Sequence, residues 1–585
     1  MKFLKYLFVV SIVLVSSLVL SACDEAEVPD VLYLNDDGYA LEDFMPEESN
    51  FVLAYSNFDE GQKVALEALM EKLGVEDDLF YSDDLVGVFN DYGIDYNEDI
   101  RAMFGENYRM LMAASVDFSS DGATSAGVIE LYDNQDAVGM ILTFTIEDTE
   151  KAADVMNKLA LNEGFVKSDI DGYLTLADSE SGSHMMLVDD ALVITSSQEE
   201  LSEALDRYNS EMLALTDNEG YLEAVGHFEE PQLGYLYLNM SNLDLGDSPT
   251  PMSFKGYTGL YQVYGVQAVE DGLELSGLAE FDKKELKKLG INFQDFKNGG
   301  AYLVDKLKNS DPFALYSESY NIAQGLRMTP LLQDPGLNDS FQAFFGSTLE
   351  DGLFSWMDQG FSMALYRGEW LIPGLTLVFD ANSNLEKARE FYFKLDGQLS
   401  GLVTLAQAQG LPMLSKKTEG TMTIVSADLS ELPLEAAGAA LPLPEGTVLP
   451  NLDLSYGITE DGFFAISLQK DFNEKYLATN TSGAEKYDMA IKKLGNTDGG
   501  VTFIDFEPMN AYLSGLSEVF TQMYMSRFGD ADVKIDGEPV VTAEPEFTKT
   551  INSIMGVLDS FDYFIIGNKI KSNHQVESKG YLKFR

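Results

Sequence analysis

The hydrophobic positions along the chain follow a strand-then-helix order that occurs twice. Residues 51–58, FVLAYSNF, have the aromatic and β-branched content of a strand and run into a helical pattern with apolar positions at Val64, Leu66, Leu69, Met70 and Leu73. Residues 312–320, PFALYSESY, run into NIAQGLRMTPLL in the same way. We therefore expect a strand followed by a helix at both places.

The clearest correspondence joins residues 140–159 with residues 374–395. Each segment has a strand, a cluster of Asp, Asn, Ser or Thr that suits helix capping, and a helix entered through Lys-Ala, at Lys151 and at Lys387. The two positions are 387 − 151 = 236 residues apart. Acidic pairs beginning at Glu98 and Glu350 mark a further helix start in each copy, because the helix dipole favours negative charge there.

Both copies then continue with alternating apolar and polar positions, which predict half-buried antiparallel strands. In the first copy, turns are expected at Asp171-Gly172, Ser181-Gly182 and Asp189-Asp190. The pattern predicts an α+β fold of two related units, residues 46–290 and 291–585, each a broad antiparallel sheet covered by amphipathic helices.

Two segments stand apart from this pattern. Residues 282–300, at the boundary, hold the densest basic cluster, Lys283, Lys284, Lys287 and Lys288. A solvated linker helix is the favoured interpretation, and contact with an anionic lipid or partner is the alternative. Residues 431–446 carry three prolines and are expected to form a loop.

The first 22 residues are expected to be a signal peptide. Lys2 and Lys5 precede an apolar run over residues 6–20, which is shorter than a typical membrane span, and the run closes with Leu-Ser-Ala-Cys. This closing sequence resembles the lipobox of bacterial lipoproteins, which implies that the Cys23 thiol is acylated and begins the mature chain. The alternative is a soluble secreted protein in which the cysteine is incidental.

Residues 23–45 are acidic and rich in turn residues, so we expect them to form a tether between Cys23 and the folded body. Acyl chains on Cys23 would hold the protein on a membrane through hydrocarbon burial. The resemblance therefore implies a bacterial cell-envelope protein that is lipid-anchored and extracytoplasmic, on the periplasmic or cell-surface face.

Composition limits the possible functions. The chain has 585 residues, with 97 Asp plus Glu against 38 Lys plus Arg and a formal charge of −59. Its 36 Phe and 29 Tyr exclude disorder as the global state, and its charge makes binding to a phosphate backbone unfavourable. Cys23 is the only cysteine, so no disulfide forms within the chain.

Motifs for metal binding and catalysis are missing from the sequence. The three histidines, His184, His227 and His574, lie in separate segments, and neither HExxH nor CxxC occurs. GxSxG, GxGxxG and P-loop patterns are also absent. His184 and His574 adjoin predicted turns and are expected at the surface. We therefore predict no catalytic residue, no metal site and no cofactor.

A few residues are candidates for a ligand site. Residues 117–122 and 529–538 imitate parts of calcium-binding loops without the full ligand spacing. Trp356 is expected in the core. Trp370, in a predicted loop, is the better candidate for a ligand platform, although ordinary packing is favoured for it too.

The chain resembles an uncharacterised family of exported bacterial proteins that is known as a domain of unknown function. The resemblance rests on Pro46 followed by FVLAYSNFD, the strand and D-x-E-K-A helix, the passage LVDDALVITSSQEELSEAL over residues 187–205, and the sheet-forming C-terminus. It covers most of residues 46–585. It implies an envelope location and an α+β fold, and it assigns no catalytic residues.

The expected function is that of a non-enzymatic envelope lipoprotein that binds a ligand or a partner. One version places a lipid-like ligand in an apolar pocket, and the residues of a ligand site are not indicated by the sequence. The alternatives are a structural or assembly component of an envelope complex and, less favoured, a hydrolase of envelope polymers that uses carboxylates.

Overall fold

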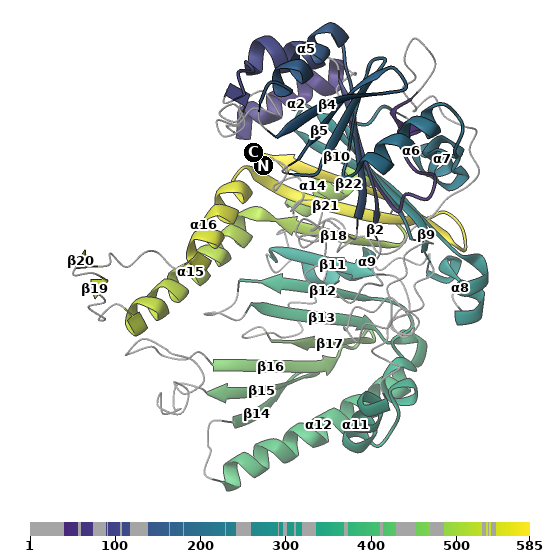
Figure 1. Ribbon diagram of the computed structural model, residues 1–585. Coiled ribbons are helices and arrows are strands. Elements are labelled where there is room, and N and C mark those ends of the chain that lie inside the picture. The colour runs from purple at the N-terminus through teal and green to yellow at the C-terminus, as the bar shows by residue number, and fades with distance from the viewer. Residues whose placement is uncertain are drawn as a thin grey trace. The chain divides into compact units, whose positions relative to one another are not determined.

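The computed structural model describes most of the chain after residue 39 (Figure 1). The described residues are 40–56, 60–73, 89–90, 92–105, 108–116, 138–162, 164–179, 181–228, 230–240, 259–290, 292–296, 301–308, 312–318, 335–367, 373–409, 414–428, 451–468, 485–495, 497–528, 534–535, 538–539 and 546–585. The chain divides into two compact units: unit 1 is Met1–Lys288 with Lys571–Lys579, and unit 2 is Leu289–Ile570 with Gly580–Arg585.

Unit 1 is built on an antiparallel sheet. Its strands pair in the order β4, β5, β6, β7, β3, β2, β1, β8, β9, β10. Its elements are η1 (Leu41–Phe44), β1 (Phe51–Ser56), α2 (Glu60–Leu73), η2 (Tyr96–Arg101), α4 (Ala102–Phe104), β2 (Arg109–Val116), β3 (Val138–Thr145), α5 (Thr149–Leu159), β4 (Phe165–Ile170), β5 (Tyr173–Asp178), β6 (His184–Val188), β7 (Ala191–Thr195), α6 (Gln198–Tyr208), η5 (Leu215–Asp217), α7 (Glu219–Val225), β8 (Gly234–Asn239), β9 (Gly259–Val269), β10 (Gly272–Phe281) and α8 (Lys283–Leu289).

Unit 2 is also built on an antiparallel sheet, in the order β14, β15, β16, β17, β13, β12, β11, β18, β21. Figure 1 shows these strands side by side, with α12 packed near β14. Its elements are η6 (Phe293–Phe296), α9 (Ala301–Leu307), β11 (Ala314–Glu318), α11 (Pro335–Phe345), η9 (Glu350–Phe354), β12 (Phe361–Tyr366), β13 (Gly374–Asp380), η10 (Asn382–Asn384), α12 (Leu385–Ala408), β14 (Leu414–Glu419), β15 (Met422–Asp428), β16 (Asn451–Ile458), β17 (Phe463–Ser467), α14 (Glu485–Leu494), β18 (Gly500–Asp505), α15 (Phe506–Phe528), β19 (Lys534–Ile535), β20 (Glu538–Pro539), α16 (Glu546–Leu558) and β21 (Phe561–Ile570), while β22 (Gln575–Phe584) contributes residues to both units.

The expected combination of helices with a broad antiparallel sheet is confirmed. The two strand orders also correspond position by position, from β4 and β14 at one end through β1 and β11 to β9 and β21. Each unit has a short π-helix, η2 or η9, before the strand that pairs with its first strand.

The predicted caps explain where two of the helices begin. Asp148 accepts a hydrogen bond from the backbone N–H of Lys151 at the start of α5, and Asn384 accepts one from that of Lys387 at the start of α12. The turn at Asp171-Gly172 joins β4 to β5, and both residues have positive φ, 52° and 94°. A two-residue turn with positive φ at both positions matches the right-handed twist of the strands that it joins.

Residues 40–45 correct the predicted tether at its C-terminal end. Leu41, Phe44 and Met45 lie in the main core of unit 1, each at most 3% exposed. The backbone carbonyl of Phe44 accepts a hydrogen bond from the buried Arg207 side chain, and the ring of Phe44 stacks on Tyr208. Leu41, Phe44 and Met45 therefore belong to the folded unit rather than to a tether.

Trp356 forms the centre of a core cluster in unit 2, as expected. It is fully buried among Phe379, Phe391 and Phe464, and its indole N–H donates to the backbone carbonyl of Gly352 at 3.1 Å. The basic residues of the boundary segment lie on α8, which agrees with the helical interpretation.

Several predictions concern residues outside the described part of the chain. These are the signal peptide, Cys23 and most of the tether; the helix after residue 320; residues 117–122; the loop over residues 431–446; and Trp370. Of residues 529–538, the structure describes only Lys534–Ile535 and Glu538, which belong to the paired strands β19 and β20.

Glu318 is a buried carboxyl group at the end of β11. It is 4% exposed, and its Oε1 accepts a hydrogen bond from the hydroxyl of Tyr316 at 3.0 Å. Gly500 lies opposite on β18, where an added Cβ would come within 2.7 Å of Glu318 Oε2. Burial raises the pKa of Glu318 to about 8, because the charged form loses its hydration.

We expect Glu318 to make unit 2 less stable as pH rises. The folded state holds the carboxyl proton up to about pH 8, whereas the unfolded chain releases it near 4.5, so the free energy of unfolding falls between these values. The slope contributed by one proton is at most about 1.4 kcal/mol per pH unit. Glu318→Gln should remove this slope in hydrogen exchange of β11 and β18, whereas the exposed control Glu460→Gln should retain it. An unchanged slope in Glu318→Gln would contradict the assignment.

Candidate functional site

The floor of a pocket in unit 1 is set by the register of three strands. Asn239 of β8 lies opposite Tyr261 of β9, and Tyr261 lies opposite Glu280 of β10. Residues directly opposite in an antiparallel pair point to the same face, so these three side chains form one row. Tyr237 lies two residues before Asn239, so it adds to the same face.

The rim of the pocket comes from two segments that one side chain holds together. Asn218 caps α7, where its Oδ1 accepts the N–H of Tyr221 at 2.8 Å. The Nδ2 of the same side chain donates to the carbonyl of Glu47 at 2.8 Å, in the turn after η1. A bridge between Pro46 and Ala214 also fixes this turn. The rim therefore depends on where η1 packs.

Together these segments line an open pocket with a volume of about 480 Å³. The lining is dominated by acidic and aromatic side chains rather than by aliphatic ones. Its residues are Glu47, Glu48, Asn218, Glu219, Gly220, Glu223, Tyr237, Asn239, Leu260, Tyr261 and Glu280. Pockets of roughly 300–1,000 Å³ are the usual size for small-molecule sites.

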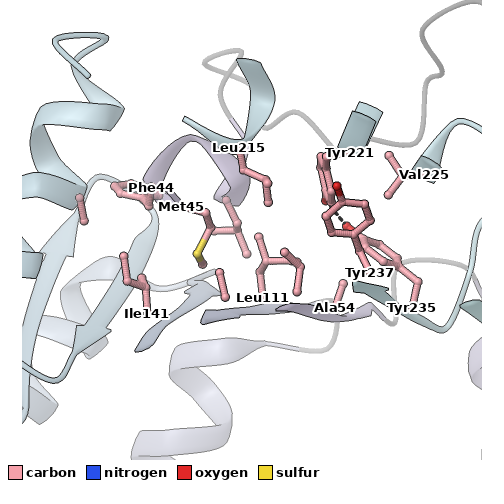
Figure 2. Close-up of a cluster of buried hydrophobic side chains, with 14 of the residues drawn as sticks. Phe44, Met45, Ala54, Leu111, Ile141, Leu215, Tyr221, Val225, Tyr235 and Tyr237 are labelled. Carbon is pink, nitrogen blue, oxygen red and sulfur yellow. Dashed lines mark hydrogen bonds between the residues drawn. The ribbon is translucent and has the colours of Figure 1, made fainter. Parts of the chain in front are cut away.

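Beside this pocket lies a buried ion pair. Arg109 of β2 donates two hydrogen bonds to Glu42 of η1, at 2.5 and 2.7 Å, and neither side chain is more than 1% exposed. The hydroxyl groups of Tyr221 and Tyr235 donate to Glu42 Oε1 at 3.0 and 3.2 Å. Figure 2 shows Tyr221 and Tyr235 linked to each other, with Tyr237 beside them.

The charges of this pair offset the cost of burying it. Burial by itself would raise the pKa of Glu42, but the charge and hydrogen bonds of Arg109 outweigh it, and the pKa lies below the ordinary value. Burial and the nearby charge of Glu42 raise the pKa of Tyr221, so this hydroxyl stays protonated and donates. The pair thus fixes η1 to β2 and, through Tyr221, to α7.

Tyr237 connects the ion-pair network to the pocket. Its ring packs edge-on against Tyr221, with 5.2 Å between ring centroids, and its side chain is 1% exposed. Its hydroxyl lies 3.9 Å from the position of a Cβ on Gly220, a second lining residue. Among the residues that the structure describes, none forms a hydrogen bond with this hydroxyl. The pocket wall therefore presents a hydroxyl group that makes no hydrogen bond to any described residue.

The histidines are distributed over unit 1. His184 begins β6 and is half-buried, and Nε2 of His227 lies 3.9 Å from Glu577. The surface position expected for His574 is wrong, because this residue is 7% exposed. Its turn folds back onto β10, where the backbone carbonyl of His574 accepts the N–H of Phe281 and Nε2 lies 3.8 Å from Glu280.

In the described part of the chain, no group of three or more His, Cys, Asp or Glu side chains is placed to hold one metal ion. The helices that the structure describes include none with the length and apolar character needed to cross a membrane.

Comparison with known families places the chain in one of them. The family model described as "Protein of unknown function (DUF3352)" matches residues 83–524, so the protein belongs to this family. The resemblance to a family known as a domain of unknown function is thereby confirmed.

Comparison with solved structures finds two crystal forms of TP0453. Form IV has a TM-score of 0.23 and 8% identity, and the match covers 41% of this chain and 79% of that chain. Form I has a TM-score of 0.21 and 8% identity, with 46% and 88% covered. The curated proteins contain no match to this chain.

We expect Glu42→Gln to destabilise unit 1 by about 3–5 kcal/mol, because it leaves Arg109 buried without a compensating charge. The double variant Glu42→Leu with Arg109→Met should recover most of this loss, since it removes both charges. Because the pKa of Glu42 is lowered, its contribution should also be lost as pH falls below about 4.5. Denaturant unfolding read by hydrogen exchange in β1 and β2 measures both effects. Equal losses for Glu42→Gln and the exposed control Glu199→Gln would contradict this account.

Proposed function

We propose that this protein is a lipid-anchored binding protein of the bacterial cell envelope and that unit 1 carries its ligand site. The observation that carries the proposal is the pocket of about 480 Å³ between α7, the turn after η1, and strands β8 to β10. Its wall is held by the buried Glu42–Arg109 pair and by Asn218, so the site is pre-formed. A pre-formed site reduces the entropy lost on binding.

The polar lining favours a polar ligand over the lipid-like ligand of the sequence hypothesis. Of the residues that line the pocket, only Leu260 is aliphatic. A fatty acyl chain would displace water from the carboxylates that line the pocket and offer them no hydrogen bond in return, which is unfavourable. The ligand of this site is therefore a molecule that hydrogen-bonds with carboxylates.

The body of the protein consists, in this proposal, of two units that arose from a common ancestor. The matching strand orders, the paired π-helices and the equivalent caps of α5 and α12 support this relationship. A shared fold in two units does not require a shared function, because function depends on local residues. The acidic pocket is a property of unit 1.

The anchor is assigned to Cys23. The Leu-Ser-Ala-Cys sequence and the apolar run before it support acylation, and the acidic residues after Cys23 suit a tether. The negative charge of −59 would repel the body from anionic headgroups while the acyl chains hold it nearby.

Cys23→Ser is expected to release the full-length protein from the membrane fraction, because a hydroxyl group does not replace the acylated thiol. Fractionation of cells that express both forms, with mass spectrometry of the N-terminal peptide, measures the effect. Retention of Cys23→Ser in the membrane fraction would contradict the anchor.

We expect Gly220→Leu to abolish ligand binding without unfolding unit 1. An added Cβ at Gly220 meets Asn218, Tyr261 and Tyr237 only at 3.4–3.9 Å, so a larger side chain extends into the pocket without a backbone clash. A library of polar metabolites screened by thermal shift supplies the ligand. At a concentration of about 100 times Kd, a bound ligand stabilises the folded state by about 2.7 kcal/mol.

Gly397→Leu in α12 is the matched control, because its Cβ meets nothing within 4 Å and lies in unit 2. The control should respond to the same ligands as the natural protein. If every ligand that shifts the melting temperature of the natural protein shifts that of Gly220→Leu equally, the proposed site is wrong.

A further inference from the structure

The pocket of unit 1 carries an excess of one kind of charge. Five of its lining residues are glutamates, which come from the turn after η1, from α7 and from β10: Glu47, Glu48, Glu219, Glu223 and Glu280. The described lining includes no Lys, Arg or His. Acidic side chains that line a concave site focus the negative potential there, and a cation that enters relieves their mutual repulsion.

The spacing of these glutamates disfavours a single metal ion. Metal sites need several ligands that converge on one point, and the described residues include no such group. Here the acidic side chains surround a volume of about 480 Å³. A cation whose positive charges are separated along its length would reach more of them than a point charge would.

The aromatic wall supplies a second, independent feature. Tyr237 and Tyr261 line the pocket with 6.3 Å between their ring centroids. Tyrosine rings attract ammonium groups and pack against methylene chains. The hydroxyl of Tyr237, on a side chain 1% exposed, has no hydrogen-bond partner among the described residues and can accept a hydrogen bond from an N–H donor at the wall.

We propose that this pocket binds a linear aliphatic polyamine, a small molecule with two or more ammonium groups joined by methylene chains. The ammonium groups pair with the glutamates, the methylene chains lie against Tyr261 and Leu260, and one ammonium group donates to the Tyr237 hydroxyl. This inference rests on the proposed function, since it names the ligand class of the same site.

Calorimetric titration of the full-length protein in detergent with spermidine tests the proposal. One saturable site is expected at 150 mM NaCl. Magnesium chloride that supplies the same concentration of positive charge as the spermidine should not compete for this site. Glu219→Gln should weaken binding about tenfold, because it removes a charge-assisted hydrogen bond. The exposed Glu199→Gln on α6 changes the net charge equally and should leave the affinity unchanged.

Tyr237→Phe separates recognition from folding. The change removes a hydroxyl that makes no hydrogen bond within the described part of the chain, so the melting temperature should stay the same or rise, while the affinity for spermidine falls severalfold. A hydroxyl with a purely structural role would give the reverse result, a lower melting temperature with unchanged affinity.

Several outcomes would overturn the polyamine assignment. They are equal effects of Glu219→Gln and Glu199→Gln, displacement by magnesium, tighter binding of tri-lysine than of spermidine, and binding of spermidine that Gly220→Leu does not alter. If the protein bound a neutral or anionic ligand and Gly220→Leu abolished that binding, the proposed binding site would stand and the polyamine class would be wrong. The absence of any ligand sensitive to Gly220→Leu would reject both.

Discussion

The buried Glu42–Arg109 pair is the interaction on which unit 1 depends. It joins η1, the short helix before the first strand, to the first residue of β2, and its carboxylate also accepts hydrogen bonds from two tyrosines. Breaking such a pair leaves an uncompensated charge, so the arrangement has little tolerance for change. Because Tyr221 belongs to α7, the same carboxylate fixes the helix that forms one rim of the pocket. The Glu42–Arg109 pair therefore supports both the stability of unit 1 and the shape of its pocket.

Two groups of acidic residues differ in their surroundings, those on the exposed surface and those that line the unit 1 pocket. Acidic side chains such as Glu199 and Glu460 are exposed in the described part of the chain, where water and salt screen their charge. The glutamates of the unit 1 pocket differ because they share a concave volume with two tyrosines and lack a basic residue in the described lining. The solvated surface keeps the protein soluble, whereas the pocket offers a site where several charges act on one ligand.

The sequence predicted those parts of the fold that local patterns determine. The cap at Asp148 and the turn at Asp171-Gly172 follow from residues within four positions of each other, and both are confirmed. The ion pair was not predicted, because Glu42 and Arg109 are 67 residues apart and Glu42 lies in a stretch with many other acidic residues. The pocket was missed for a similar reason, since its residues meet only through the register of β8, β9 and β10 and the packing of α7 and the turn after η1. His574 is buried by a contact between its turn and β10 that no local pattern indicates.

Hydrogen exchange of the full-length protein with and without spermidine tests the central claim most directly, because it locates the ligand without a mutation. Binding in the pocket predicts slower exchange in α7 and at the end of β8, with β12 and β13 of unit 2 unchanged. Protection that is spread equally over both units would mean diffuse association with the acidic surface. That result would contradict a dedicated site in unit 1.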